Sequence, residues 1–443
     1  MGAIPEKRLG AVRMLIEQAP DRVVLGLGTA LDSRRQTGPM AEVQSLVSAE
    51  MIDRRLRDGV FGPLIPLCRD GDKPALLPPA SPRLLWAALK AELPASVAEA
   101  RRATQALRRD DGPPPIYDEL CRRAAEGLRE RGPCYAQAAA QLEKSPAGSI
   151  ERLVAGLGLT SLARVLLPRL PGWVRSMDGE AAAAVRLAFK DAGEIDENSA
   201  PTFMEMIHGQ LEDAPWQILR VISAVMDRPS DRYLAASEMA SFGERLLADM
   251  DRRIEAVRAF DPDAGPEVAV RLAASIQVAT VIISEFEQWL DIAKDGPWGS
   301  RLVKAKKALA ASVESRMREA PAAVTAALPS YPARSSGKSS RMMPRTTADL
   351  DKAAVRRGYA MLTFLSECRS SAAHGGFASM RSKIIEELDK QIDLYSDDLI
   401  DSLHEHGDMA ERLHAYIEVA ADFLGLVRDP KAAEIVRRRA AVA

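Results

Sequence analysis

The chain has 443 residues, of which 47% are hydrophobic, 28% are charged and 5% are aromatic. This mix is typical of a globular protein, and the length exceeds that of one simple core, so we expect two or three domains. The formal net charge of −2 excludes a global field that would attract nucleic acid or an acidic membrane surface. Such a partner would need a local basic patch.

The first 145 residues predict an N-terminal helical module with a Pro/Gly-rich loop. The periodic spacing of apolar residues predicts helices at 5–19, 40–57, 94–109, 116–129 and 134–142. Ser81 and Pro82 predict a further helix start, with Ser81 as the cap. Residues 23–31 read VVLGLGTAL and fit a helix, although 23–25 equally fit a short strand. Residues 59–81 predict a long loop that packs on a surface.

Residues 146–328 predict a central domain of longer helices. Helices are expected at about 230–259, 266–292 and 298–317, with Ser230 capping the first of them. The segment 266–292 is apolar on most sides, so neighbouring elements must cover most of it. We therefore expect this segment to be the central helix of the domain.

Residues 329–347 predict a flexible basic linker. The stretch contains three prolines, a run of serines and four cations, and it contains no acidic residue and no apolar period. A segment of this kind cannot bury a face, so we expect it to be solvated. The candidate partner-contact residues are its cations, Arg334, Lys338, Arg341 and Arg345.

Residues 348–443 predict a C-terminal helical bundle. Thr347 can cap a first helix, and Gly375 and Gly376 can end it. Two further apolar stripes joined by short turns predict a small antiparallel bundle. No alternating apolar and polar runs of useful length occur anywhere, so the fold class is all-α with an irregular multi-helical body. A solenoid-like stack stays open, although no repeat of about 33 to 47 residues is found.

One acidic motif resembles the DDxxD helix of terpene synthases and prenyltransferases. Asp397, Asp398 and Asp401 have its spacing, and in those all-α families the resemblance implies magnesium bound against a diphosphate. The second acidic motif of those families is not evident. At about 100° per residue, Asp397 and Asp401 lie opposite the apolar stripe of their helix. We therefore expect them to face water.

The remaining polar motifs predict no site. His404, His406 and Asp408 are close in sequence, but two histidines separated by two positions point about 200° apart on a helix. Ser336 to Ser339 resemble the end of a phosphate-binding loop, yet Pro332 stands where that loop needs glycine. The four cysteines (Cys68, Cys121, Cys134 and Cys368) have neither zinc nor disulfide-framework spacing, which favours buried free thiols in a reducing cytoplasm.

These features together predict a cytoplasmic, non-enzymatic helical scaffold or adaptor that binds other proteins and needs no cofactor. The longest mostly apolar run, 272–283, is shorter than the about 20 residues of a membrane span, so no integral membrane segment is expected. Self-association is compatible with the sequence. Two alternatives stay open: an all-α magnesium-dependent enzyme acting on a diphosphate, and a binder of nucleic acid or another anionic surface through basic patches.

Overall fold

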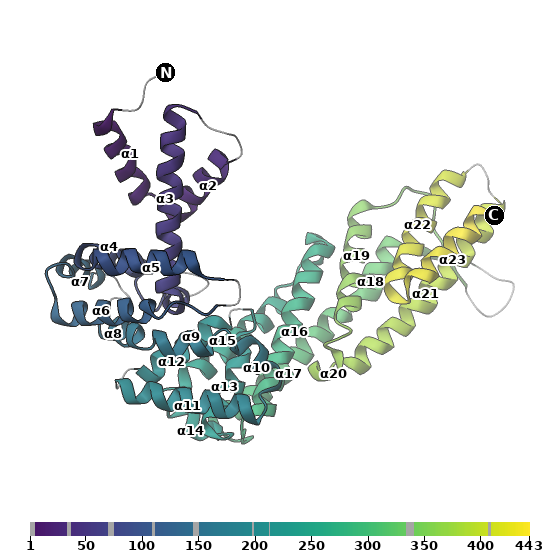
Figure 1. Ribbon diagram of the computed structural model, residues 1–443. Coiled ribbons are helices and arrows are strands. Elements are labelled where there is room, and N and C mark those ends of the chain that lie inside the picture. The colour runs from purple at the N-terminus through teal and green to yellow at the C-terminus, as the bar shows by residue number, and fades with distance from the viewer. Residues whose placement is uncertain are drawn as a thin grey trace. The chain divides into compact units, whose positions relative to one another are not determined.

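The computed structural model describes residues 5–32, 37–69, 75–108, 111–144, 150–196, 199–211, 213–333, 341–405 and 409–443 (Figure 1). These ranges contain 23 α-helices and one two-stranded sheet, so the predicted all-α class is confirmed. The chain divides into two compact units, Met1–Asp227 and Arg228–Ala443.

The N-terminal unit is helical throughout its described part. Its elements are α1 (Glu6–Gln18), α2 (Asp21–Asp32), α3 (Pro39–Val60), η1 (Gly62–Cys68), α4 (Ser81–Glu92), α5 (Pro94–Ala106), α6 (Ile116–Glu130), α7 (Ala136–Leu142), α8 (Ile150–Gly158), α9 (Thr160–Leu166), α10 (Leu170–Ser176), α11 (Gly179–Ile195), α12 (Ser199–Gln210), η2 (Pro215–Gln217) and α13 (Ile218–Met226).

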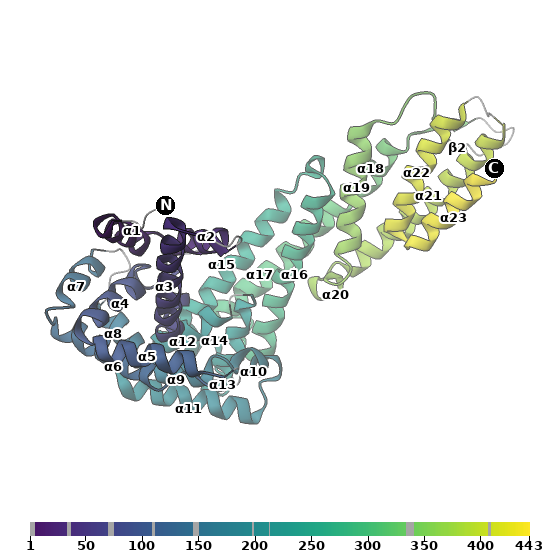
Figure 2. The ribbon, with the colours of Figure 1, turned by 45° about the horizontal axis from the view of Figure 1, so that its top comes forward.

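Helices α1, α2 and α3 share a small core of their own. Helices α1 and α2 lie on opposite sides of α3 (Figure 2), and their core consists of Ile16, Val24, Leu31 and Val47. Residues 23–31 are therefore helical, and the strand alternative for 23–25 is wrong. A Cβ on Gly28 would lie 2.2 Å from the sulfur of Met51, so α2 approaches α3 closely because this position has no side chain.

A buried carboxylate joins α3 to α4 and α5. Asp53 is 7% exposed and accepts hydrogen bonds from the Trp86 indole at 2.9 Å, from Lys90 at 2.9 Å and from Arg101 at 2.8 Å. A buried charge is tolerated when paired and hydrogen-bonded in this way. The contact fixes three successive helices of the unit to one another.

The C-terminal unit contains the longest helices. Its elements are α14 (Asp231–Ala235), α15 (Ala240–Arg258), η3 (Pro262–Ala264), α16 (Pro266–Trp289), α17 (Pro297–Met317), α18 (Ala320–Ala327), β1 (Ser330–Ala333), β2 (Arg341–Pro344), α19 (Lys352–Glu367), α20 (Ala372–Gly375), α21 (Ala378–Glu405), α22 (Ala410–Val427) and α23 (Pro430–Ala441).

Helix α16 forms the centre of this unit, near the predicted span of 266–292. It packs against α15, α17 and α19 and buries ten of its residues. By length and composition alone it is the one helix in the described ranges that could cross a membrane, which the shorter apolar run in the sequence did not predict. Because 44% of its most apolar window is buried in the unit, packing also accounts for this composition.

The structure caps two helices differently from the prediction. Ser81 lies inside the first turn of α4, where its hydroxyl donates to the Pro78 carbonyl at 2.7 Å instead of capping the helix. Helix α19 is capped by Asp351, whose side chain accepts from the Ala353 and Ala354 amides, and not by Thr347. The predicted caps at these two places are therefore wrong. Ser230 does cap a helix, since its side chain accepts from the Tyr233 amide at 3.3 Å, but this helix is the short α14, because the predicted helix at 230–259 is divided into α14 and α15.

The described ends of the predicted linker form a hairpin. Ser330 pairs with Pro344 and Ala333 with Arg341 in the antiparallel pair β1–β2, and β2 contacts α21. The Arg345 amide donates to the Pro329 carbonyl at 2.8 Å, and the Tyr395 hydroxyl donates to the same carbonyl at 3.3 Å. These parts are thus hydrogen-bonded to each other and to the unit, although Tyr331 and Met342 keep exposed side chains. The proline content of this segment predicted a linker. Proline is nevertheless tolerated in edge strands, which is why β1 and β2 can form here.

The compact units also differ from the predicted domains 1–145, 146–328 and 348–443. Helix α19 packs against α16 and α18, which precede the hairpin, and the rings of Phe260 and Phe364 stack with centroids 5.4 Å apart. Residues on both sides of the hairpin therefore share one core. Local composition predicted a linker at 329–347 and could not show which helices meet across it.

Candidate functional site

Helices α19 and α22 lie side by side and run in the same direction. Asp349, just before α19, pairs with Arg412 at 3.0 Å, and further along α19 the Tyr359 hydroxyl donates to Asp422. The later residue of the α19 segment, Tyr359, contacts the later residue of α22, Asp422. The two helices are therefore parallel. Their first turns therefore lie at the same end of the pair.

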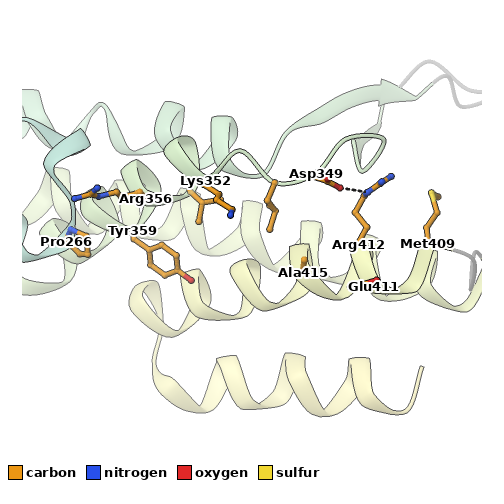
Figure 3. Close-up of a pocket in the computed structure, with 11 residues that line it drawn as sticks. Pro266, Asp349, Lys352, Arg356, Tyr359, Met409, Glu411, Arg412 and Ala415 are labelled. Atoms are coloured by element: carbon orange, nitrogen blue, oxygen red, sulfur yellow. Dashed lines mark hydrogen bonds and ion pairs between the residues drawn. The ribbon is translucent and has the colours of Figure 1, made fainter.

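A pocket of about 880 Å³ occupies this end (Figure 3). Its size falls within the range of about 300 to 1,000 Å³ that is common for ligand sites. The lining comes from the start of α16, the segment before α19, the first two turns of α19 and the first two turns of α22. The lining residues are Pro266, Asp349, Leu350, Lys352, Val355, Arg356, Tyr359, Met409, Glu411, Arg412 and Ala415.

The pocket carries more cations than anions. Lys352, Arg356 and Arg412 line it, against Asp349 and Glu411. Lys352 has no carboxylate partner within the described ranges. Arg356 donates to the Ala264 carbonyl at 2.7 Å, a contact that does not neutralise its charge.

The ion pair inside the pocket leaves much of this positive charge available. Asp349 is 89% exposed at its side chain, so its pairing with Arg412 is largely screened by water. Helices α19 and α22 also begin here, and helix amino ends carry partial positive charge. The Asp351 cap offsets this charge on α19, while the lining side chains themselves comprise three cations and two carboxylates.

The apolar part of the lining is contributed by both helices and the segment before α19. Leu350, Val355, Met409 and Ala415 supply it together with the ring of Tyr359. The Tyr359 hydroxyl is held by Asp422, which also pairs with Arg437, and the ring lies edge-on to Phe423 with centroids 5.0 Å apart. Burial and then this hydrogen bond raise the pKa of Tyr359, so it stays a neutral phenol.

This arrangement suits binding of an amphipathic anion. None of the lining side chains is histidine, cysteine or serine, and the Tyr359 hydroxyl is already hydrogen-bonded. Cations around an apolar surface can recognise a carboxylate or phosphate while apolar groups of the same ligand are buried. The sequence reasoning missed this site, although Lys352 and Arg356 stand four residues apart, a spacing that places both on one helix face.

The predicted partner-contact residues are not gathered into one site. Arg334 and Lys338 lie outside the described residues. Arg341 is described only through its backbone pairing with Ala333, and Arg345 is exposed just after β2. Their role in partner contact stays a prediction.

The acidic motif does not line a described pocket. Asp397 forms an ion pair with Arg439 at 2.7 Å and is partly covered, which corrects the prediction that it faces open water. Asp398 is 4% exposed, whereas Asp401 is exposed as expected. Within the described ranges no three His, Cys, Asp or Glu side chains are grouped as a metal site would need. His404, His406 and Asp408 lie outside the residues whose side chains are described.

The cysteines divide into three buried thiols and one exposed thiol. Burial raises the pKa of Cys68 and of Cys368 to about 12 and that of Cys121 to about 11, so these three stay protonated and unreactive. Cys134 is exposed, in contrast to the prediction. The buried thiols act as small apolar side chains.

The geometry of the pocket is the basis for a functional assignment because sequence relationships supply none. Comparisons with protein-family models, with curated proteins and with solved structures found no match to this chain.

Proposed function

We propose that this protein is a helical scaffold or adaptor, and that the α19–α22 pocket binds a short amphipathic segment of a partner protein carrying acidic side chains. The observation that carries the proposal is the apolar lining beside three cations, of which Lys352 has no carboxylate partner in the described ranges. An acidic segment would supply the missing counter-charges.

A peptide segment suits the pocket better than a compact ion. The lining residues in Figure 3 are spread in a row from Pro266 past Tyr359 and Ala415 to Met409. A ligand that contacts the whole row must be elongated, and it must present apolar and acidic groups side by side. An amphipathic helix that packs into a groove has these properties.

The first test is binding of a designed peptide to the full-length protein. The probe is a fluorescent helical peptide with leucine on one face and glutamate elsewhere, and its control carries lysine in place of glutamate. We expect the glutamate peptide to bind and the lysine peptide not to bind, as measured by fluorescence anisotropy. Equal binding of both peptides, or binding of neither, would refute the proposal.

A variant then locates the binding site. Lys352→Glu/Arg356→Gln should weaken binding of the glutamate peptide at least about tenfold, because it removes the two cations on the α19 side of the pocket. The matched control is Lys383→Glu/Lys431→Gln, which changes the net charge equally at exposed positions on α21 and α23. The control should bind like the unmodified protein. Equal affinity of both variants would exclude this pocket.

The same assay tests the anionic-surface alternative. A single-stranded oligonucleotide is added in place of the peptide over a range of salt concentrations. Binding of nucleic acid through phosphate contacts should fall steeply with salt because counterions are released. Tight, salt-sensitive oligonucleotide binding without peptide binding would favour that alternative over the scaffold.

A further inference from the structure

A hollow of about 570 Å³ lies in the N-terminal unit, between Lys90 of α4 and one side of α5. The residues that α5 contributes recur at intervals of three and four positions, so they share one side of the helix. The charged lining residues are Lys90, Arg101 and Arg102, and the other lining residues are small or apolar, as Val97 and Ala98 are. None of the described residues that line this hollow is acidic.

A buried carboxylate holds two of these cations in place. Lys90 and Arg101 contact different oxygens of Asp53, at 2.9 and 2.8 Å, so one negative charge faces two positive charges. The side chains of Lys90 and Arg101 are still 42% and 45% exposed, which leaves both of them free to contact a ligand as well. Because Asp53 already restricts their conformations, a ligand that binds to them pays less for ordering side chains.

Arg102 adds a third positive charge to the hollow. It is exposed, and among the residues that the structure describes its side chain has neither an ion-pair nor a hydrogen-bond partner. The acidic residues nearest in sequence, Glu92 and Glu99, do not line the hollow, and Glu92 is paired with Arg123 at 3.7 Å. Three cations therefore meet one carboxylate here, which leaves an excess of positive charge.

We propose that this hollow binds the phosphate group of a phosphate ester, at a site separate from the α19–α22 pocket. A phosphate monoester carries about 1.5 to 2 negative charges at neutral pH and three terminal oxygens that accept hydrogen bonds. Its charge and its acceptors match three cations better than a carboxylate does. A neighbouring hollow of about 260 Å³ shares Lys90 and Arg101 with the first, so it gives room for the rest of the ester.

The first test is calorimetric titration of the full-length protein with inorganic diphosphate, compared with acetate at the same ionic strength. We expect diphosphate to bind and acetate not to bind, because only the phosphate groups can engage all three cations. Binding of neither anion, or equal binding of both, overturns the proposal.

A second arm identifies the source of the phosphate. Co-sedimentation of the protein with vesicles that contain phosphatidic acid is compared with co-sedimentation with vesicles of phosphatidylcholine alone. Binding of diphosphate without binding to the phosphatidic acid vesicles assigns the hollow to a soluble ester. Binding to both assigns it to a lipid headgroup.

One variant removes a cation from the hollow. Arg102→Gln should raise the dissociation constant for diphosphate at least about fivefold, because a charge-assisted hydrogen bond to phosphate is lost. Since Arg102 is exposed, the fold should be unaffected. The matched control is Arg129→Gln, which removes the same charge at an exposed position of α6 outside the hollow and should bind like the unmodified protein. Equal affinity of the two variants would exclude this hollow.

A second variant keeps every cation and fills the hollow instead. Ala98 is exposed and lines the hollow, so Ala98→Glu places a carboxylate there that competes with the phosphate for the cations. Diphosphate should bind at least about tenfold more weakly to this variant. Its control is Ala183→Glu at an exposed position of α11, which should leave binding unchanged. An Ala98→Glu protein that binds diphosphate as tightly as the unmodified protein would show that the hollow is not the site.

Discussion

At the scale of single residues, Asp53 shows how this helical protein keeps a charge in its interior. Burial alone would raise the pKa of Asp53, but hydrogen bonds from Lys90 and Trp86 and the charges of Lys90 and Arg101 outweigh it and lower the pKa. The carboxylate therefore favours the folded state above the pKa that it has in the unfolded chain. This contribution is lost as the pH falls through the lower, folded pKa.

We predict that Asp53→Asn lowers the free energy of unfolding of the N-terminal unit by about 1 to 3 kcal/mol at neutral pH, because the buried carboxylate loses its charge-assisted hydrogen bonds to Lys90 and Arg101, whose own side chains are 42% and 45% exposed. Urea unfolding of both proteins at neutral and at acidic pH measures the effect. The difference between the proteins should shrink in acid, since protonation removes the same charge from the unmodified protein. A difference that persists at all pH values would contradict the assigned cause.

A control for Asp53 is an exposed ion pair in the same unit. Lys190 and Glu194 on α11 lie 4.0 Å apart with side chains 74% and 69% exposed. Glu194→Gln should therefore change the free energy of unfolding by less than about 1 kcal/mol.

At the scale of helices, the position of α19 depends on a glycine. A Cβ on Gly358 would lie 2.6 Å from the ring of Phe423 on α22 and 3.4 Å from Ala327 on α18. Helix α19 therefore approaches α22 more closely than a residue with a Cβ would allow, whereas the Cβ would make only an ordinary contact with Ala327. This contact also fixes the spacing of α19 and α22, whose first turns line the pocket.

We predict that Gly358→Ala lowers the free energy of unfolding of the C-terminal unit by about 1 to 3 kcal/mol, because the clash with buried Phe423 outweighs the better helix propensity of alanine. Urea unfolding measures the change. The control is Gly10→Ala in α1, where open space surrounds the new methyl group and a small stabilisation is expected. A stabilised Gly358→Ala protein would show that the helices can move apart without cost.

At the scale of the whole molecule, the division into units is the feature that sequence and structure describe differently. The sequence predicts a break at 329–347, whereas the structure keeps 228–443 as one compact unit. The deciding contacts are those of α19 with α16 and α18, including the stacked rings of Phe260 and Phe364. A fragment that begins after the hairpin would lose all of them.

We predict that residues 228–443 expressed alone unfold cooperatively, and that residues 348–443 alone are far less stable, because α19 then exposes the side that α16 and α18 cover. Thermal unfolding followed by circular dichroism compares the two fragments. A cooperative transition of 348–443 at the same temperature as that of 228–443 would support the boundary predicted from sequence instead.

The sequence by itself determined the all-α class and most helices, because the spacing of apolar residues along a helix is a local property. The central helix near 266–292, the cap at Ser230 and the exposure of Asp401 could all be predicted in this way.

Only the tertiary structure decided which helices meet. The parallel pairing of α19 with α22, the pocket at their first turns and the ion pair of Asp397 with Arg439 join residues far apart in sequence. Local periodicity shows which side of a helix is buried but not which partner buries it. The partner is selected by packing, as at Gly358 against Phe423, and so by the chain as a whole.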